Sequence, residues 1–268
     1  MKDYQFLANQ IQEKKSMLCV GLDPDLKLIP KIFHDSDEPL YHFCKSLIEI
    51  CHTYAIAFKL NVAFFESQGP TGWVQLEKVI RCIPENCLII LDAKRADIGN
   101  TSLQYANYYF NVLNVDAVTL HPYMGYDSIE PFLVHKNKWS IVLALTSNEG
   151  SKDIELKCLS NGNMVYEETL KLFSYKSSHE QIMFVCGATH PESFQNIRKI
   201  CPDHFLLVPG VGAQGGDLQK IIEFGKNSSG GLIINVSRGI SYPPEGYAFN
   251  DWVQQKAEYY QKKISVFL

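Results

Sequence analysis

Eight short apolar runs alternate along the chain with segments of helical periodicity, and this alternation limits the fold more than any other feature. The runs, rich in Val, Ile, Leu and Phe, are Met17–Leu22, Ala55–Leu60, Cys87–Leu91, Ala117–Leu120, Ile141–Leu145, Ile182–Cys186, Phe205–Val208 and Gly231–Val236. Helical spacing recurs between them, over Trp73–Ile83, Thr101–Val112, Val165–Phe173, Pro191–Ile200 and Leu218–Phe224. Continuous apolar strands alternating with amphipathic helices are typical of a parallel sheet covered by helices on its outer face.

The number of strands predicts a closed (β/α)8 TIM barrel, an α/β fold. Residues 1–268 are predicted to form one barrel domain, because no linker, repeat or low-complexity tract divides the chain. An open doubly wound sheet is the alternative fold. It is disfavoured because the sequence after the first strand, Gly21-Leu22-Asp23-Pro24-Asp25, lacks the usual dinucleotide fingerprint.

The composition narrows the class of protein. Hydrophobic residues make up 46% and charged residues 20% of the chain, which is typical of a globular protein. Apolar runs too short to span a membrane and an N-terminus without a signal-peptide core predict a cytoplasmic protein with no membrane partner. The net charge of −4, without a basic stripe, argues against nucleic acid as a partner.

The cysteines and histidines give no sign of a metal site. The eight cysteines include no C-x-x-C pair and mostly lie inside apolar runs, so we expect reduced core residues. The eight histidines show no metal-binding spacing, and no metal ligands are predicted. Three segments, Asp25–Pro39, Asn148–Gly162 and Ile240–Asn250, are predicted to be long loops, and Asn148–Gly162 is the candidate for a mobile lid.

Polar side chains close most of the strands, at the end where TIM barrels place their active sites. In chain order they are Asp23, Lys59, Asn61, Asp92, Lys94, Asp97, His121, Thr146, Ser147, Gln214, Ser237 and Arg238. Because residues two apart in a strand face the same side, Asp92 and Lys94 are both expected at the barrel mouth, near Lys59. A structural ion-pair network is the alternative, but so many polar groups at one end favour a functional site.

A glycine-rich segment, Pro209–Asp217, follows the seventh strand and leads into a predicted helix. Glycines let backbone N–H groups approach a phosphate, and a helix N-terminus favours negative charge. Arg238, after the eighth strand, can hold phosphate oxygens in a bidentate fork. The segment alone could be only a turn. Together with Arg238 it predicts a phosphate site at the position where TIM barrels often have one.

The run Leu91-Asp92-Ala93-Lys94-Arg95-Ala96-Asp97-Ile98-Gly99-Asn100-Thr101 closely resembles the D-x-K-x-x-D-I signature of the orotidine 5′-monophosphate decarboxylase family. The resemblance continues through Val20–Asp25, Phe58–Asn61, Leu120–Gly125, Leu145–Asn148, Pro209–Gly216 and Val236–Gly239, and so covers nearly the whole chain. The pattern is similar to the bacterial subgroup with a short phosphate loop. Ala96 departs from it, since many relatives carry glycine there.

The resemblance implies a cofactor-independent lyase that converts orotidine 5′-monophosphate to uridine 5′-monophosphate in pyrimidine biosynthesis, working as a homodimer with shared active sites. Lys94 would protonate C6 of the pyrimidine, Asp92 would lie near the substrate carboxylate, and Lys59 would hold Asp92 and a ribose hydroxyl. The other implied roles are ribose binding by Asp23, pyrimidine binding by Ser147, phosphate binding by Gln214 and Arg238, and contacts in the partner's active site by Asp97, Ile98 and Thr101.

Elementary chemistry agrees with this assignment. Loss of carbon dioxide from C6 leaves an electron pair that the ring does not delocalise well, so a fixed cation that also delivers a proton is needed. A lysine held between carboxylates keeps its charge.

Three other functions stay open. A magnesium-dependent sugar-phosphate decarboxylase or hexulose-phosphate synthase typically has an acidic metal ligand where Lys59 stands. A Schiff-base aldolase needs an uncharged lysine amine, which the carboxylates of Asp92 and Asp97 oppose at Lys94. A nucleotide-binding protein without catalysis does not require both Lys94 and Asp92.

Overall fold

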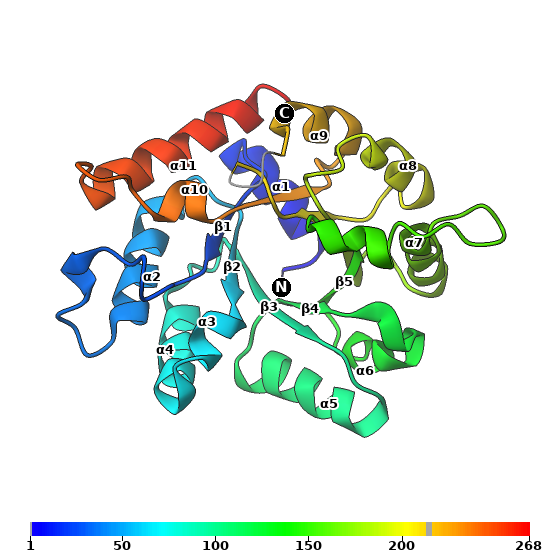
Figure 1. Ribbon diagram of the computed structural model, residues 1–268, viewed down its shortest axis with the longest axis horizontal. Coiled ribbons are helices and arrows are strands. Elements are labelled where there is room, and N and C mark those ends of the chain that lie inside the picture. Colours follow the sequence, from blue (N-terminus) through cyan, green and yellow to red (C-terminus); the bar gives the residue numbers. More distant parts are fainter. Residues whose placement is uncertain (1, 213–215) are drawn as a thin grey trace.

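The chain folds into a closed barrel of eight parallel strands, as predicted, with helices around it (Figure 1). The computed structural model describes residues 2–212 and 216–268. The strands are β1 (Leu18–Leu22), β2 (Ala57–Asn61), β3 (Leu88–Arg95), β4 (Ala117–Leu120), β5 (Trp139–Leu145), β6 (Ile182–Cys186), β7 (Leu206–Val208) and β8 (Leu232–Val236). They pair in sequence order, and β8 closes the barrel on β1.

Most helices follow a strand in the chain and lie outside the barrel. These are α2 (Pro39–Cys51), α3 (Val62–Glu66), α4 (Gly69–Cys82), α5 (Gly99–Asn107), α6 (Glu130–Leu133), α7 (Val165–Lys176), α8 (Ser193–Ile200), α9 (Leu218–Gly225), α10 (Arg238–Ser241) and α11 (Phe249–Ser265). Before them, α1 (Tyr4–Lys14) lies across one end of the barrel (Figure 1). Asp3 caps its start by accepting the N–H of Phe6, and Lys15 ends it in a left-handed conformation.

The predicted loops contain short helices. A 3₁₀ turn, Lys31–Phe33, interrupts the first, and another, Glu149–Asp153, opens the second. The third loop is shorter than predicted, because α10 ends at Ser241 and α11 begins at Phe249.

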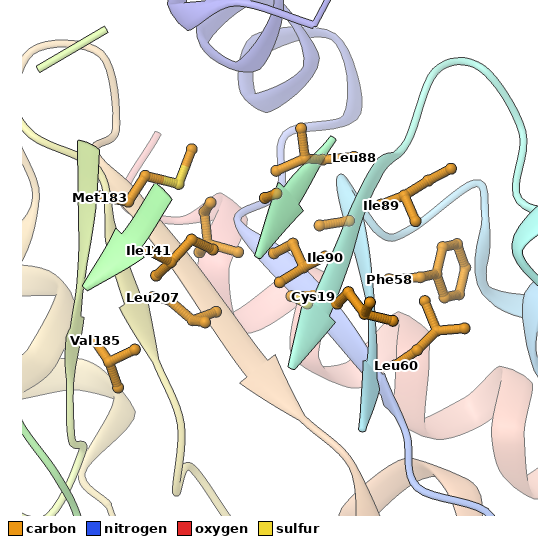
Figure 2. Close-up of a cluster of buried hydrophobic side chains, with 14 of the residues drawn as sticks. Cys19, Phe58, Leu60, Leu88, Ile89, Ile90, Ile141, Met183, Val185 and Leu207 are labelled. Carbon is orange, nitrogen blue, oxygen red and sulfur yellow. The ribbon is translucent and has the colours of Figure 1, made fainter. Parts of the chain in front are cut away.

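The barrel interior is filled by apolar side chains. Successive residues of a strand face opposite sides, so each strand contributes to the interior and to the layer beneath the helices. Figure 2 shows Ile90, Ile141 and Leu207 between the strands, whereas Phe58 and Leu60 lie on the outer side of β2; all five are buried. The same alternation turns the side chain between Phe58 and Leu60 into the barrel. That residue is a lysine.

The cysteine prediction is confirmed for six of the eight residues. Cys19, Cys44, Cys51, Cys87, Cys186 and Cys201 are buried, and all eight cysteines are free. Cys82 is half-buried and Cys158 is exposed. Among the described residues, no helix combines the length and apolar character that crossing a membrane requires.

Candidate active site

The third strand loses its regular pairing where its charged residues lie. Leu91 pairs with Val118 of β4, but the next pair is Arg95 with Leu120, so the residues between form a bulge in β3. Within it, Lys94 has a φ of 47°, a left-handed conformation that costs a non-glycine residue about 1–2 kcal/mol. The predicted regular alternation is therefore wrong at this point: Asp92 and Lys94 meet across a bulge, not along an ideal strand.

Asp92 joins two lysines at the barrel mouth. Its Oδ2 accepts a hydrogen bond from Lys59 Nζ at 2.6 Å, and its Oδ1 accepts one from Lys94 Nζ at 2.6 Å. Lys59 and Asp92 are 4% and 9% exposed, whereas the Lys94 side chain is 50% exposed. The carboxylate is thus satisfied on both oxygens, and the outer ammonium remains accessible from the mouth.

The neighbours of this cluster keep its two buried groups charged. Burial opposes the charged form of Asp92, but the ammonium groups of Lys59 and Lys94 outweigh it and hold the pKa of Asp92 well below its usual range. Burial likewise opposes the charged form of Lys59. The carboxylates of Asp92 and Asp23 outweigh it and raise the pKa of Lys59 above its ordinary value.

The sequence interpretation missed Thr119, a buried residue of β4. Its hydroxyl donates to Asp92 Oδ1 at 2.8 Å and accepts the backbone N–H of Lys94 at 3.0 Å. A threonine inside an apolar run is an ordinary strand residue, since β-branched side chains favour strands. The one available signal was a hydroxyl in an otherwise apolar strand.

Two adjoining cavities open at this end of the barrel. The first, of about 200 Å³, is lined by Lys59, Asp92, Lys94, Thr119, Leu143, Thr146, Ser147, Asn148, Val185, Leu207 and Pro209. The second, of about 220 Å³, is lined by Asp23, Lys59, Asn61, Ser147, Pro209, Gly210, Val211, Asn235, Ser237 and Arg238. Lys59, Ser147 and Pro209 belong to both. The structure therefore brings nine of the twelve predicted strand-end residues to one mouth: Asp23, Lys59, Asn61, Asp92, Lys94, Thr146, Ser147, Ser237 and Arg238.

The second cavity offers unused polar groups. Asp23 Oδ1 and Ser237 Oγ are buried without a hydrogen-bond partner among the described residues. Arg238 is exposed at the rim, and no carboxylate in the described part of the chain lies within salt-bridge distance of it. Because buried polar atoms are nearly always hydrogen-bonded, Asp23 and Ser237 suit the polar groups of a ligand. The Arg238 guanidinium suits an anionic group.

Of the described residues of the glycine-rich segment, Pro209, Gly210 and Val211 line the second cavity. Gly210 has a φ of 96°, which a side chain would strain. Asp217 and Leu218, at the start of α9, are not among the described residues that line the cavity, and the Asp217 carboxylate caps α9 by accepting the Lys220 N–H at 3.2 Å. The short helix beside the cavity is α10, which begins at Arg238. Gln214 lies outside the described residues.

Ser147 is positioned from two sides. The backbone N–H and the hydroxyl of the preceding Thr146 donate to the Glu155 carboxylate, with shortest distances of 2.6 and 2.9 Å. On the other side lies Gly187, where an added Cβ would be 2.6 Å from the Ser147 nitrogen. Glu155, a second residue that the sequence interpretation missed, thus ties the 148–162 segment to the end of β5.

The structure does not bring Asp97, Ile98 or Thr101 to the cavities of their own chain. They lie around the start of α5, outside both linings. Ile98 is 54% exposed, Thr101 is exposed, and Asp97 Oδ1 accepts the N–H of Ile98 at 2.8 Å. His121, at the end of β4, is likewise exposed and outside both linings.

The family model of the orotidine 5′-phosphate decarboxylase / HUMPS family matches residues 16–245. The chain belongs to this family. The orotidine 5′-phosphate decarboxylase of Bacteroides fragilis is 50% identical over 241 residues, covering 89% of this chain and 88% of that protein. The enzyme of Phocaeicola vulgatus is 47% identical over 263 residues, covering 97% of both proteins. The resemblance inferred from the D-x-K-x-x-D-I run is confirmed.

Solved structures of the same family have the same barrel. The putative orotidine-monophosphate-decarboxylase of Toxoplasma gondii superposes with a TM-score of 0.89 at 34% identity, covering 98% of this chain and 95% of that one. The OMP decarboxylase of Leishmania donovani gives a TM-score of 0.85 at 34% identity, with coverage of 99% and 98%. The predicted TIM barrel is therefore confirmed by relatives as well as by the strand pairing.

Proposed function

We propose that the chain decarboxylates orotidine 5′-monophosphate to uridine 5′-monophosphate in pyrimidine biosynthesis, with Lys94 as the proton donor to C6. This reaction is the one for which a relative 50% identical to this chain is named, and it is one of the two activities in the name of the family model. The observation that carries the assignment of Lys94 is the pair of 2.6 Å bonds joining Asp92 to Lys59 and Lys94 at the floor of a cavity.

The proposed chemistry needs only protein side chains. The bond between C6 and the carboxylate breaks, carbon dioxide leaves, and the electron pair stays on C6. The Lys94 ammonium stabilises that pair and then transfers a proton to it, after which solvent reprotonates the amine through the open mouth. Asp92 accepts the Lys94 ammonium through Oδ1 and orients it, while Lys59 donates to the second carboxylate oxygen of Asp92.

The second cavity would hold the rest of the nucleotide. Asp23 Oδ1 would accept a ribose hydroxyl, since it is buried without a partner among the described residues and Asp23 lines this cavity. Arg238, with the backbone around Gly210, would hold the 5′-phosphate, and Gln214 is assigned to the same group. Ser147 lines both cavities and would bind the pyrimidine edge.

The proposal assigns no metal and no organic cofactor to the reaction. A magnesium-dependent sister activity would place an acidic ligand at Lys59, where the buried ammonium disfavours a cation. In the portion of the chain that is described, no group of three or more His, Cys, Asp or Glu residues is arranged to hold a metal ion. Lys59 is therefore the residue that separates the two reactions.

We further propose a homodimer with shared sites. Asp97, Ile98 and Thr101 belong to the family signature yet lie outside the cavities of their own chain, and Ile98 is largely exposed. Tyr123 and Met124, which follow the adjacent strand β4, are also exposed, at 79% and 43%. Apolar side chains exposed after neighbouring strands support contact with a second copy of the chain.

The reaction is tested by adding orotidine 5′-monophosphate to the purified protein and following the pyrimidine absorbance, with and without excess EDTA. The expected result is conversion to uridine 5′-monophosphate at the same rate in both samples. Activity that EDTA removes and magnesium restores would instead place the chain with the metal-dependent sister enzymes.

The shared site is tested by mixing two inactive homodimers, Lys94→Ala and Asp97→Ala. Random reassociation gives about half hybrids, each with one intact site, so activity should return to about a quarter of wild type. Verified hybrids without activity would contradict the shared-site proposal.

A further inference from the structure

The hydroxyl of Thr119 closes a ring of hydrogen bonds around the charged cluster. The Lys94 N–H donates to Thr119 Oγ1 at 3.0 Å, so the hydroxyl proton is left to donate to Asp92 Oδ1 at 2.8 Å. The same carboxylate oxygen accepts Lys94 Nζ at 2.6 Å. The Thr119 side chain is thus hydrogen-bonded both to the backbone of Lys94 and to Asp92, the carboxylate that accepts the Lys94 ammonium.

The position of Thr119 in the sheet explains why a side chain makes these bonds. Val118 pairs with Leu91 and Leu120 pairs with Arg95, so Thr119 alone lies opposite the three bulged residues, Asp92 to Lys94. A bulge removes main-chain ladder partners, and a buried N–H needs a replacement acceptor. The Thr119 hydroxyl is that acceptor for Lys94, the residue that the bulge holds in the left-handed region.

Burial makes the hydroxyl hard to replace. Thr119 is 1% exposed and lines the floor of the first cavity with Asp92 and Lys94. Its proton is engaged by Asp92 and one of its lone pairs by the Lys94 N–H, so it acts on the reaction through these two residues. Chains of hydrogen bonds in such surroundings strengthen one another.

We propose that Thr119 is a positioning residue for the decarboxylation. Its hydroxyl fixes the bulge of β3 and the orientation of the Asp92 carboxylate, and thereby keeps Lys94 Nζ directed at the cavity floor where C6 reacts. This inference rests on the proposed role of Lys94 as proton donor.

The test compares Thr119→Val, which keeps the shape and loses the hydroxyl, with Thr119→Ser, which keeps the hydroxyl. The expected result for valine is a roughly 10- to 100-fold fall in kcat, the effect of losing one hydrogen bond to a charged group. KM and the Kd for uridine 5′-monophosphate should stay within about threefold of wild type, because the phosphate and ribose groups of the second cavity are untouched. Serine should restore kcat to within about threefold.

Two further variants keep the outcome unambiguous. Thr119→Ala also lacks the hydroxyl, and its kcat should fall to the same extent. It replaces Thr119→Val in the comparison if the valine variant does not fold. Ser140→Ala removes another buried hydroxyl, from β5 beside Val118, and should leave kcat unchanged.

Three outcomes would overturn the positioning role. They are wild-type kcat in the valine and alanine variants, a serine variant as slow as valine, and a matching loss of kcat in Ser140→Ala. Failure of the proposed function itself would be seen separately, as a wild-type protein that does not convert orotidine 5′-monophosphate.

Discussion

The cations at the two ends of the barrel differ in how their hydrogen bonds are satisfied. At the end covered by α1, Lys14 Nζ donates to the carbonyl oxygens of His52, Ala55 and Asn86 at 3.0, 2.8 and 3.1 Å. Arg198 of α8 donates to the carbonyl oxygens of Cys201, Pro202, His204, Gly225 and Gly231. At this closed end, backbone oxygens from successive loops satisfy each cation.

At the open end the polar groups are only partly satisfied. Lys94 stands half-exposed on a bulge in a strained conformation, and Asp23 Oδ1 has no partner within the described chain. Such costs persist where a ligand or a reaction makes use of them. The closed end thus contributes stability, whereas the open end leaves polar groups available to the proposed substrate.

The largest expected effect follows from removing the proposed proton donor at the open end. Lys94→Ala should lower kcat for orotidine 5′-monophosphate by at least about 10⁴-fold, because both proton transfer and charge stabilisation are lost. Lys152→Ala, which removes an exposed lysine of the 148–162 segment, is the matched control and should keep wild-type activity. A covalent adduct trapped at Lys94 by borohydride would instead support the Schiff-base alternative.

A smaller effect is expected at the rim of the second cavity. A guanidinium that holds phosphate contributes about 1.5–3 kcal/mol per charged hydrogen bond. Arg238→Ala should therefore lower kcat/KM for the nucleotide by roughly 10- to 100-fold. The poor reaction of orotidine, which lacks the phosphate, should hardly change. An equal loss with both substrates would assign Arg238 to the fold or to the chemistry instead.

A third expected effect is on stability alone and concerns an exception at the closed end. Neither ring nitrogen of buried His204 has a partner in the described structure, and burial, then His179 and Arg198, lower its pKa from 6.5 to about 4. Between pH 6.5 and 4, His204 is protonated in the unfolded chain but stays neutral in the folded one. The free energy of unfolding therefore falls as the pH is lowered through this range. The loss should reach about 2–3 kcal/mol near pH 4.

The measurement is the free energy of urea unfolding at several pH values. His204→Phe, which keeps an aromatic ring next to Phe184, should flatten the fall between pH 6.5 and 4, whereas the surface variant His42→Phe should not. An unchanged slope in His204→Phe would show that other groups cause it.

Much of the fold could be predicted from the sequence because buried strands consist of continuous apolar residues. The runs at β4 and β6 match the observed strands residue for residue. The run at β3 stopped at Leu91, four residues before the strand ends at Arg95, because the charged residues begin there. Their burial depends on partners from other strands, which a local pattern does not contain.

The position of a site residue was predictable where it lies near the end of a strand, as for Lys59, Asp92 and Arg238. It was not predictable where a role depends on a contact distant in sequence. Thr119 meets Lys94 across 25 positions, and Glu155 reaches Thr146 across nine. The bulge that brings Thr119 to Lys94 has no apolar periodicity of its own. The contact between Glu155 and Thr146 likewise corresponds to no pattern in the sequence.

The most direct test of the division between the two ends pairs Lys94→Ala with Lys14→Met, each measured for decarboxylation and for unfolding free energy. Lys14→Met leaves three carbonyl oxygens without their cation and should lose about 2–3 kcal/mol of stability, with kcat/KM unchanged. Lys94→Ala should show the reverse: activity abolished, with a smaller loss of stability than in Lys14→Met, because Asp92 keeps its bond to Lys59. A Lys14→Met protein that loses activity at wild-type stability, or a Lys94→Ala protein that still decarboxylates, would contradict the account.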